Sequence, residues 1–459
     1  MKHNITFSVI AAAALASCTQ NEDFTSQYNE NAKTMKFDVA YVGKNTRATG
    51  DITSIDNKKF ILWGAAYQRT YTSSDPSSET YECSSGLWIT NKEPLTFAKT
   101  SGEGASGYWE VDGESEQANK EVAYPGSTYR TYFTAIAPSD EFASSTTDGK
   151  VNYSMGGQKS ESTTTPTSSD RKLTLENIPV VQEIDNTDNA KKGTDYLIAC
   201  QSSISEEVAL TFKHLLSKLR FAVWTDENTA EGDAATTKIE LNSLKIYLPK
   251  STATAKYVQK AHDAVAGDWT WSGFTAADAN PTTTGTNDYQ LVSLTGDSEI
   301  SSEVKAYSSP TNAHDASWTD VKVGDDKQFF IAPTESTSAN NNSPAKLFID
   351  IKYTVMRKLS DGSWSTTDQS GQTGYSAGHK VVTREKMLVP IGDSNYGHGN
   401  ETEADPDNRN EGLSHFHQGT LETLYICLRA DQKVAFSTEF KVNEWYVDNW
   451  VDDPIDINQ

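Results

Sequence analysis

The 459-residue sequence lacks several features that would place it in a large class of proteins. It contains neither a P-loop nor a dinucleotide-binding fingerprint, and long amphipathic helices and internal repeats are missing as well. Basic residues are scarce, because 40 Lys and Arg stand against 63 Asp and Glu, which gives a formal net charge of -23. Since this charge repels phosphates, we expect no nucleic-acid partner. A solvated, secreted surface is the simplest interpretation of the acidity.

Long apolar runs are also missing, and the run near the N-terminus is too short to span a bilayer. It covers Ile5 to Leu15, follows a short basic segment and ends in Leu15-Ala16-Ser17-Cys18. This pattern is typical of a bacterial lipoprotein signal peptide, in which the Cys18 thiol receives a diacylglyceryl group. Several acyl chains on one residue hold a protein stably at a membrane. We therefore predict a signal peptide and lipobox over 1–18, a tether over 19–34 and a lipid anchor in the outer membrane. An ordinary signal peptide with a chance Cys is the alternative.

Cysteine is rare. With Cys18 assigned to the lipid, Cys83, Cys200 and Cys427 remain, one in each region of the chain. An odd, scattered set does not match a disulfide framework. We expect three small buried or half-exposed thiols, although one pair could form in an oxidising compartment.

The residues that are present favour sheets over helices. The chain contains 20 Tyr, 16 Phe and 10 Trp, large side chains that suit half-buried strands, while its hydrophobic share is only 36%. At this length the chain exceeds one compact core. We therefore predict an all-β protein with two β-sandwich domains in tandem, over 35–205 and 206–459.

The stretch from Asp195 to Trp224 is predicted to join these domains. Apolar residues at alternate positions indicate two half-buried strands, with a short helical turn around His214 to Ser217 between them. We expect His214 to be a satisfied structural residue rather than a catalytic base. The two alternating sets are Val208, Leu210 and Phe212, then Leu219, Phe221 and Val223.

Another alternating pattern begins the mature fold. Met35, Phe37, Val39 and Tyr41 share one face of a predicted strand. A small, polar segment follows from Gly43 to Gly50 and indicates an exposed loop.

Motifs that could carry chemistry are weak. Gly374-Tyr-Ser376-Ala-Gly378, followed by His379, matches the pattern of a nucleophile elbow, but a polar loop precedes it where a buried strand is required. His415 and His417 would share a strand face without a third ligand nearby in sequence. An acidic loop could bind calcium through Asp405, Asp407 and Glu411, yet Arg409 stands where an EF-hand needs an oxygen ligand. We predict no catalytic residue, no cofactor and no metal site.

Two parts of the sequence resemble a known family. The lipobox at Cys18 and the spacing of Asp195 to Ala199 and Val208 to Phe221 resemble the fimbrillins, Bacteroidales surface lipoproteins that include type V pilins. Shorter similarities lie at Phe60 to Gly64, Tyr124 to Pro138 and Phe440 to Trp445. The resemblance implies two transthyretin-like β-sandwich domains, display on the cell surface and assembly into adhesive pili with other pilin subunits. Host or bacterial surface molecules, including glycans, would be the ligands.

The resemblance also implies a maturation step. In family members that polymerise, a cut after an Arg in an early loop discards the first strand, and a strand from another subunit fills the groove. Arg47 lies where this cut would fall, and the displaced strand would carry Met35, Phe37, Val39 and Tyr41. Alternatively, Arg47 is an ordinary loop residue and the strand stays in place.

The C-terminus does not look like a donor strand, because Val451 to Ile457 is short and contains Pro454. A tip, anchor or accessory subunit, or a lone surface lipoprotein, is therefore also compatible with the sequence. The alternative function is a monomeric glycan-binding outer-membrane lipoprotein, although a buried sheet position is the commoner fate of Trp. The Trp residues that would stack on sugars are Trp88, Trp109, Trp269, Trp271 and Trp364.

Overall fold

The computed structural model describes most of the chain as strands joined by short connections. The described residues are 33–41, 59–71, 79–90, 94–99, 109–112, 122–147, 149–155, 172–184, 193–227, 236–259, 267–272, 289–296, 300–309, 312–313, 315–324, 327–333, 347–365, 379–389, 419, 421–430 and 434–441. The named helices among them are η2 (Ser139–Glu141) and α2 (Trp318–Val321), so the predicted all-β class is confirmed. No helix in these ranges is long and apolar enough to cross a membrane.

The first sheet is built from β1 (Lys36–Tyr41), β2 (Phe60–Tyr71), β3 (Glu79–Trp88), β4 (Leu95–Lys99), β5 (Trp109–Val111), β6 (Tyr129–Ala137), β11 (Leu197–Ser203) and β12 (Glu207–His214). Its order is β3-β2-β4-β5-β1-β12-β11-β6, and β2 also pairs with β6. The sheet therefore closes on itself, and β1 is one member of the ring. A buried core, to which Phe37, Phe60 and Phe133 belong, draws residues from every strand of that ring.

A second sheet packs on the first. It has the order β16-β15-β9-β8-β7. Its strands are β7 (Phe142–Ala143), β8 (Val151–Met155), β9 (Lys172–Pro179), β15 (Thr252–Gln259) and β16 (Gly267–Ser272). Trp63 and Tyr132 of the first sheet share one core with Leu175 and Tyr257 of the second. Because side chains alternate along a strand, β2 and β6 can supply both this core and the core within the ring.

The remaining strands form two further sheets that share a third core. The third sheet has the order β10-β19-β13-β22-β23, with β10 (Val181–Ile184), β13 (Ser217–Trp224), β19 (Gln328–Ile331), β22 (Leu421–Leu428) and β23 (Val434–Lys441). The fourth has the order β17-β14-β20-β21, with β18 also on β14. Its strands are β14 (Thr237–Pro249), β17 (Tyr289–Ser293), β18 (Ser302–Glu303), β20 (Leu347–Arg357) and β21 (Lys380–Val389).

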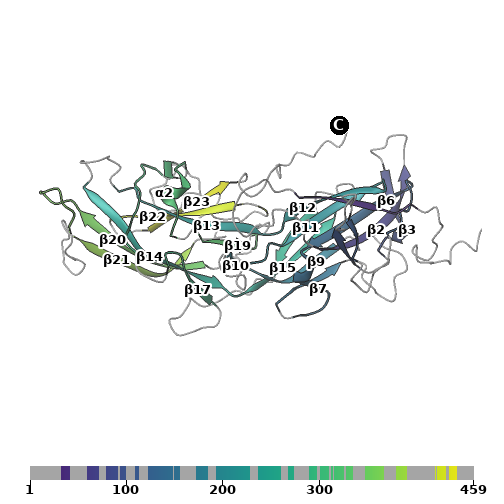
Figure 1. Cartoon of the computed structure of the whole chain (residues 1–459), viewed down its shortest axis with the longest axis horizontal. Coiled ribbons are helices and arrows are strands. Elements are labelled where there is room, and N and C mark those ends of the chain that lie inside the picture. Colours follow the sequence, from purple (N-terminus) through teal and green to yellow (C-terminus); the bar gives the residue numbers. More distant parts are fainter. Residues whose placement is uncertain are drawn as a thin grey trace, which may run out of the picture.

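The molecule is elongated, with β2, β3 and β6 towards one end and β20 and β21 towards the other (Figure 1). Near the middle, the chain crosses between the two pairs of sheets. β10 lies in the third sheet although it directly follows β9, and β15 lies in the second sheet although it directly follows β14. The second and third sheets thus combine strands from both sides of residue 206. The division into 35–205 and 206–459 stays a proposal.

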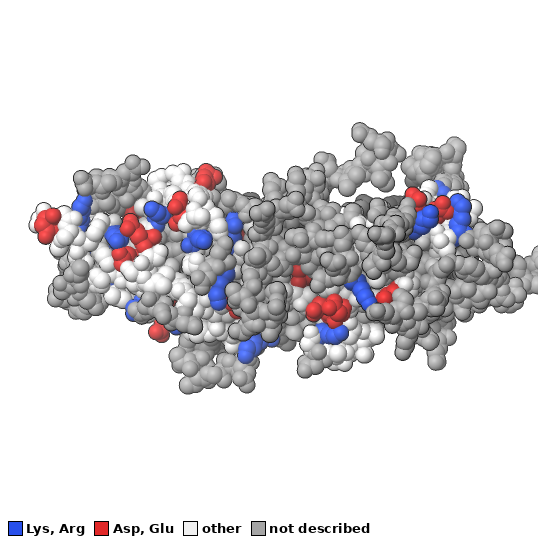
Figure 2. Space-filling model, in the orientation of Figure 1, with Lys and Arg blue, Asp and Glu red and all other residues white. Residues whose placement is uncertain are grey.

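Charges of both signs lie close together on the described part of the face drawn in Figure 2. On that face the described acidic residues are interspersed with Lys and Arg rather than gathered over one element.

Candidate functional site: the seat of the first strand

Strand β1 lies between β12 and β5 in the first sheet. It runs parallel to β12 over the whole of its length, from Lys36 opposite Glu207 to Tyr41 opposite Phe212. On the other edge β1 is antiparallel to β5, and the register pair within the described residues joins Phe37 and Trp109. Within the described residues, the ladder with β12 therefore supplies most of the pairing of β1.

The side chains of β1 that face the core form an apolar row. Met35, just before the strand, is buried, Phe37 has no exposed surface, and Val39 is half-buried against the same core. The side chain of Tyr41 lies outside the described residues. Burial of a side chain as large as Phe stabilises a fold by about 1.5–3 kcal/mol, so Phe37 is the main anchor of the strand.

Phe37 is inserted into a group of aromatic rings. Its ring meets those of Phe97 and Phe133 edge to face, at centroid distances of 5.1 and 5.2 Å. Phe60 stacks on Phe97 at 5.3 Å and meets Trp109 at 5.1 Å. These contacts come from β2, β4, β5 and β6, so the seat of Phe37 would persist as an apolar cavity if β1 were removed.

The N-terminal end of β1 is fastened to the segment before β6. The Met35 N–H donates to the Val122 carbonyl at 2.7 Å, and the Tyr124 N–H donates to the Lys33 carbonyl at 2.8 Å. An isolated bridge between Thr34 and Ala123 lies between these bonds. Lys33 and Thr34, the last residues of the predicted tether, are therefore part of the sheet.

The same end is also fastened to the turn before β12. The Lys33 ammonium lies 2.9 Å from a Glu206 carboxylate oxygen, and the hydrogen bond and charge of Glu206 raise the pKa of Lys33. The Lys36 N–H donates to the Glu206 carbonyl at 2.8 Å. The Tyr124 hydroxyl donates to the Ile204 carbonyl at 2.7 Å. We call this group the entry clamp: Lys33, Met35, Val122, Tyr124, Ile204 and Glu206.

The chain leaves this sheet through a sharp connection at Leu215 and Leu216. The prediction of two strands separated by a turn is correct, but this connection is a bend and not a helical turn. His214 is fully buried, and its Nδ1 lies 2.9 Å from an Asp195 carboxylate oxygen. It is the satisfied structural residue that the sequence predicts.

Strand β13 differs from the prediction of a half-buried strand, because all of its residues are buried. Leu219 and Phe221 face the core shared with the fourth sheet, as their alternation requires. Lys218 and Arg220, on the opposite face, are also covered, with exposures of 1% and 6%. A segment that includes α2 covers Arg220 there, and sequence alternation alone cannot detect such a distant cover.

Arg220 shows how that cover works. Its Nε donates to the Thr423 hydroxyl at 2.8 Å, and its guanidinium carbon lies 3.8 Å from the centroid of the Trp318 ring. A planar guanidinium can stack on an aromatic face while it donates within its own plane, which an ammonium cannot do. Arg220 is thus a buried structural cation.

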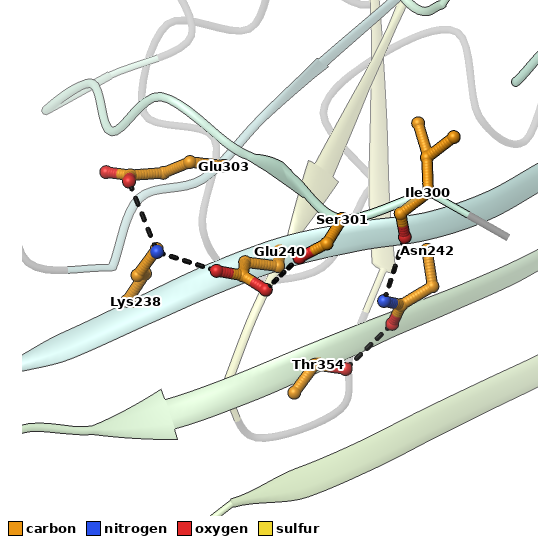
Figure 3. Close-up of polar contacts among 7 residues, drawn as sticks. All are labelled: Lys238, Glu240, Asn242, Ile300, Ser301, Glu303 and Thr354. Carbon is orange, nitrogen blue, oxygen red and sulfur yellow. Dashed lines mark hydrogen bonds and ion pairs between the residues drawn. The ribbon is translucent and has the colours of Figure 1, made fainter. Parts of the chain in front are cut away.

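A second polar cluster lies on β14, in the other half of the molecule (Figure 3). The Lys238 ammonium lies 2.6 Å from Glu240 and 3.4 Å from Glu303, and the Ser301 hydroxyl donates to the Glu240 carboxylate. Burial would raise the pKa of Glu240, but hydrogen bonds from Lys238 and Ser301, with the charges of Lys238 and His379, lower it overall.

Asn242 extends this cluster. It donates to the Ile300 carbonyl at 3.2 Å and accepts from the Thr354 hydroxyl at 2.7 Å (Figure 3). Through these contacts the segment that contains β18 covers an edge of β14, which would otherwise be an unpaired sheet edge. The cluster therefore protects the edge of the sheet.

Most residues of the other candidate motifs fall outside the described residues. These are Cys18, Arg47, Ser376, Asp405, Asp407, Glu411, His415 and His417. Of the elbow motif and its neighbour, the structure describes only His379, whose Nδ1 is buried and makes no hydrogen bond to the described residues. Within the described ranges no group of His, Cys, Asp and Glu could hold a metal ion.

The described cysteines are free thiols on different sheets, Cys200 on β11 and Cys427 on β22. Burial raises the pKa of Cys427 to about 12, against a usual value of 9.0, and the nearby Asp226 charge adds to the shift. The Cys83 side chain lies outside the described residues. Neither described thiol is poised for reaction at neutral pH.

The Trp residues proposed to stack on sugars do not form a described platform. Trp109 is 3% exposed and packs inside the ring, so the expectation that it could bind a glycan is wrong. Trp364 is half-buried, while the partly buried Trp271 packs against two cores. The side chains of Trp88 and Trp269 lie outside the described residues.

The comparison with known proteins places this chain near adhesion and fimbrial proteins of Bacteroidales. No protein-family model matches the sequence, and no curated protein matches it either. One similar solved structure is a proposed cell adhesion protein of Bacteroides uniformis, 13% identical, with 89% of this chain and 98% of that chain covered and a TM-score of 0.32. A proposed adhesin of Bacteroides thetaiotaomicron is 10% identical, with 91% and 97% covered and a TM-score of 0.30.

A fimbrial assembly protein of Parabacteroides distasonis is 8% identical, with 89% of this chain and 99% of that chain covered and a TM-score of 0.29. These neighbours fall in the class that the sequence resemblance indicates. Likenesses at such identities and TM-scores indicate no function for this chain.

Proposed function

We propose that this chain is a non-enzymatic adhesion protein of the bacterial surface, attached to the outer membrane by lipid on Cys18 until it is cut. In this proposal it acts as a fimbrial subunit or a pilus-associated adhesin, and a cut after Arg47 allows β1 to be exchanged for a strand of another subunit. The observation that carries the proposal is the position of β1. It completes a closed ring, buries Phe37 fully and pairs with β12 along its whole length.

Removal of β1 would create a specific binding site. It would expose the edge of β12 from Glu207 to Phe212 and empty the aromatic seat of Phe37. An unpaired edge is a template for another strand, and an apolar cavity beside it selects strands that carry a large side chain at the matching position. The rest of the ring would remain to hold that site in shape.

The exchange would leave the far end of the molecule undisturbed. Within the described residues, Met35, Phe37 and Val39 pack in the core within the ring, whereas the third and fourth sheets share a separate core. A subunit could therefore keep its distal sheets folded while its first strand is replaced. The resemblance implies two transthyretin-like domains. In such a fold one domain could exchange its first strand while the other stays folded.

The direct test is the N-terminus of the protein on intact cells. We expect N-terminal sequencing to find a chain that begins at Ala48, and an Arg47→Ala variant to begin at the lipidated Cys18. A wild-type protein that still begins at Cys18 would contradict maturation at Arg47. Electron microscopy of the same cells would show whether filaments are present and whether Arg47→Ala abolishes them.

A further inference from the structure

Two rings meet the ring of Phe37 in an arrangement that an aliphatic side chain cannot reproduce. Phe97 and Phe133 lie edge to face with it, at interplanar angles of 75° and 86°. In this geometry the positive edge of one ring faces the negative face of another, and the attraction adds to what the buried area alone supplies. The seat of Phe37 therefore favours an aromatic side chain over a leucine.

Gly64 sets the position of one of these rings. It lies on β2 directly opposite Phe133 of β6. A Cβ atom at Gly64 would lie 2.6 Å from two atoms of the Phe133 ring, so the ring would have to shift. Because Phe133 has no exposed surface and lies in a packed core, it has little room to do so. The missing side chain at Gly64 thus keeps Phe133 where it meets Phe37.

The positions on either side of Phe37 in the same row are apolar as well. Met35 is buried, and Val39 is half-buried against the same core. Since alternate side chains of a strand point to one face, a strand in this seat must carry apolar side chains two positions before and two positions after the aromatic one.

A charged group on the protein adds a further requirement. The Lys33 ammonium lies 2.9 Å from a Glu206 carboxylate oxygen, and Lys33 stands four residues before Phe37. The pair is partly exposed to solvent, so its contribution is smaller than that of the ring. Glu206 nevertheless favours Lys or Arg at this position over a neutral or acidic residue.

The backbone contacts fix the direction of the strand. β1 runs parallel to β12 over its whole length, whereas its bridge from Thr34 to Ala123 is antiparallel. Parallel and antiparallel ladders space their hydrogen bonds differently. A strand inserted in the opposite direction would therefore mismatch both neighbours, and its cation would lie away from Glu206.

From these contacts we propose that the seat of β1, once vacated, recognises a strand of defined pattern that runs parallel to β12. In order, the pattern is a Lys or Arg, any residue, an apolar residue, any residue, an aromatic residue, any residue and a β-branched apolar residue. The occupant is an extended segment of another subunit with this pattern. The inference rests on the proposed function, because the seat is vacant only if β1 is exchanged.

A competition experiment tests the pattern. A recognition sequence for a specific protease is inserted after residue 47, and the severed strand carries a fluorescent label. Synthetic peptides copying residues 33–44 are then added until the labelled strand is displaced. Phe37→Leu in the peptide should weaken displacement at least about fivefold, and Phe37→Ala at least about fiftyfold. Equal displacement by the unaltered and the Phe37→Leu peptides would refute selection of an aromatic residue.

The direction is tested with a peptide that carries residues 33–44 in reverse order. It has the same composition and also places Phe between two apolar residues at alternate positions. We expect it to displace the labelled strand at least about tenfold less well than the unaltered peptide. Equal displacement would refute recognition of strand direction.

The charge requirement is tested by reversal. Lys33→Glu in the peptide should weaken displacement about two- to fivefold, and Glu206→Lys in the protein should restore it. Lys36→Ala in the peptide is the matched control, because it removes the same charge from an exposed position, and it should change displacement by less than about twofold. If Glu206→Lys restores nothing, the role of Glu206 is refuted.

The role of Gly64 is tested in uncut chains. Gly64→Ala, Phe37→Leu, the double variant and the wild type are compared by urea denaturation. We expect the double variant to lose less stability than the sum of the two single losses, because a displaced Phe133 no longer favours Phe at position 37. Additive losses would refute the positioning of Phe133 by Gly64.

These outcomes are distinct from those that test the proposed function. If the wild-type protein is never cut after Arg47, maturation is refuted, while the preferences measured with the engineered cut and in the uncut chains remain. If the unaltered peptide never displaces the severed strand, the exchange itself is refuted, and recognition of an incoming strand is refuted with it.

Discussion

Strands β1 and β13 are similar in direction but differ in how completely they are covered. Each runs parallel to a strand far away in the sequence, β1 to β12 and β13 to β22. On its second edge β1 faces β5, where Phe37 pairs with Trp109, and β13 faces β19, with which it pairs from Ser217 to Arg220. Lys36 of β1 is exposed, while every residue of β13 is buried.

The comparison shows that burial of an anchor does not decide whether a strand can be replaced. Phe37 is as well buried as Phe221. What differs is how many faces of the strand are covered. The connections that join each strand to the rest of the chain also differ. β13 joins β12 through two residues and is enclosed on both faces, so its release would dismantle the third sheet.

The largest effect is expected from severing the chain beside each strand. Cutting at a protease site after residue 47 and removing the fragment should lower the free energy of unfolding by roughly 3–5 kcal/mol, because the seat of Phe37 is emptied. Urea denaturation measures this loss, and a peptide copying residues 33–44 should restore it. The same peptide with Phe37→Ala should restore little.

The matching cut on the side of β13 is made at a protease site between residues 228 and 235. Here we expect both halves to elute together in gel filtration without denaturant, because β10–β19, β9–β15 and β13–β22 pair across the cut. If the halves separated, β13 would be as easily released by a nearby cut as β1, and the proposed difference between the two strands would be wrong.

A smaller effect is expected from replacing, on each strand, a charged residue whose side chain points away from the hydrophobic core. Arg220→Ala should cost about 2–3 kcal/mol, because it deletes a charged hydrogen bond to Thr423 and the stack on Trp318. Arg220→Lys should recover only part of this, since an ammonium lacks the planar fork. Lys36→Ala on β1 is the control and should change stability by less than about 0.5 kcal/mol. Equal losses for Lys36 and Arg220 in urea denaturation would show that the enclosure of β13 contributes nothing.

The smallest effect concerns solvent access to the two strands, with Cys427 on β22 as the probe beside β13. A pKa of about 12 in place of 9.0 lowers its thiolate fraction about a thousandfold at neutral pH, so alkylation should be very slow in the native protein. Val39→Cys on β1 should be alkylated at least tenfold faster. Mass spectrometry after timed alkylation measures both rates, and rapid labelling of native Cys427 would contradict the enclosure.

The same pKa shift predicts the effect of alkaline pH. Because the folded-state pKa is raised, the contribution of Cys427 to stability is complete below pH 9 and is lost as the pH rises from about 9 to about 12. At pH 10 the loss would be about 1 kcal/mol. Urea denaturation at pH 8 and pH 10 should show a smaller change in Cys427→Ala than in the wild type.

Several elements could be predicted from the sequence because their pattern is local. The alternation at Val208 to Phe212 predicts β12, and the near-continuous apolar run at Phe60 to Tyr67 predicts a strand buried on both faces, as β2 is. The register shift in the apolar pattern between Leu241 and Leu244 corresponds to the irregularity between Leu241 and Ser243 on β14.

The entry clamp could not be predicted in this way. Lys33 lies in a polar segment with the composition of a tether, and nothing near it in sequence indicates that Tyr124 and Glu206 lie beside it. The crossing of β10 and β15 between sheets is equally invisible, because alternation shows which side chains are buried but not against which strand they pack.

Local composition and side-chain period were thus enough to establish an all-β chain, most of its strand positions and the apolar row that β1 presents to the core. Pairing partners, the closed ring, the cover over Arg220 and the entry clamp emerged only once the chain was folded. The physical reason is that the period of a strand depends on its own backbone. Its neighbours are chosen by contacts between residues that can be more than two hundred positions apart, as Arg220 and Thr423 are.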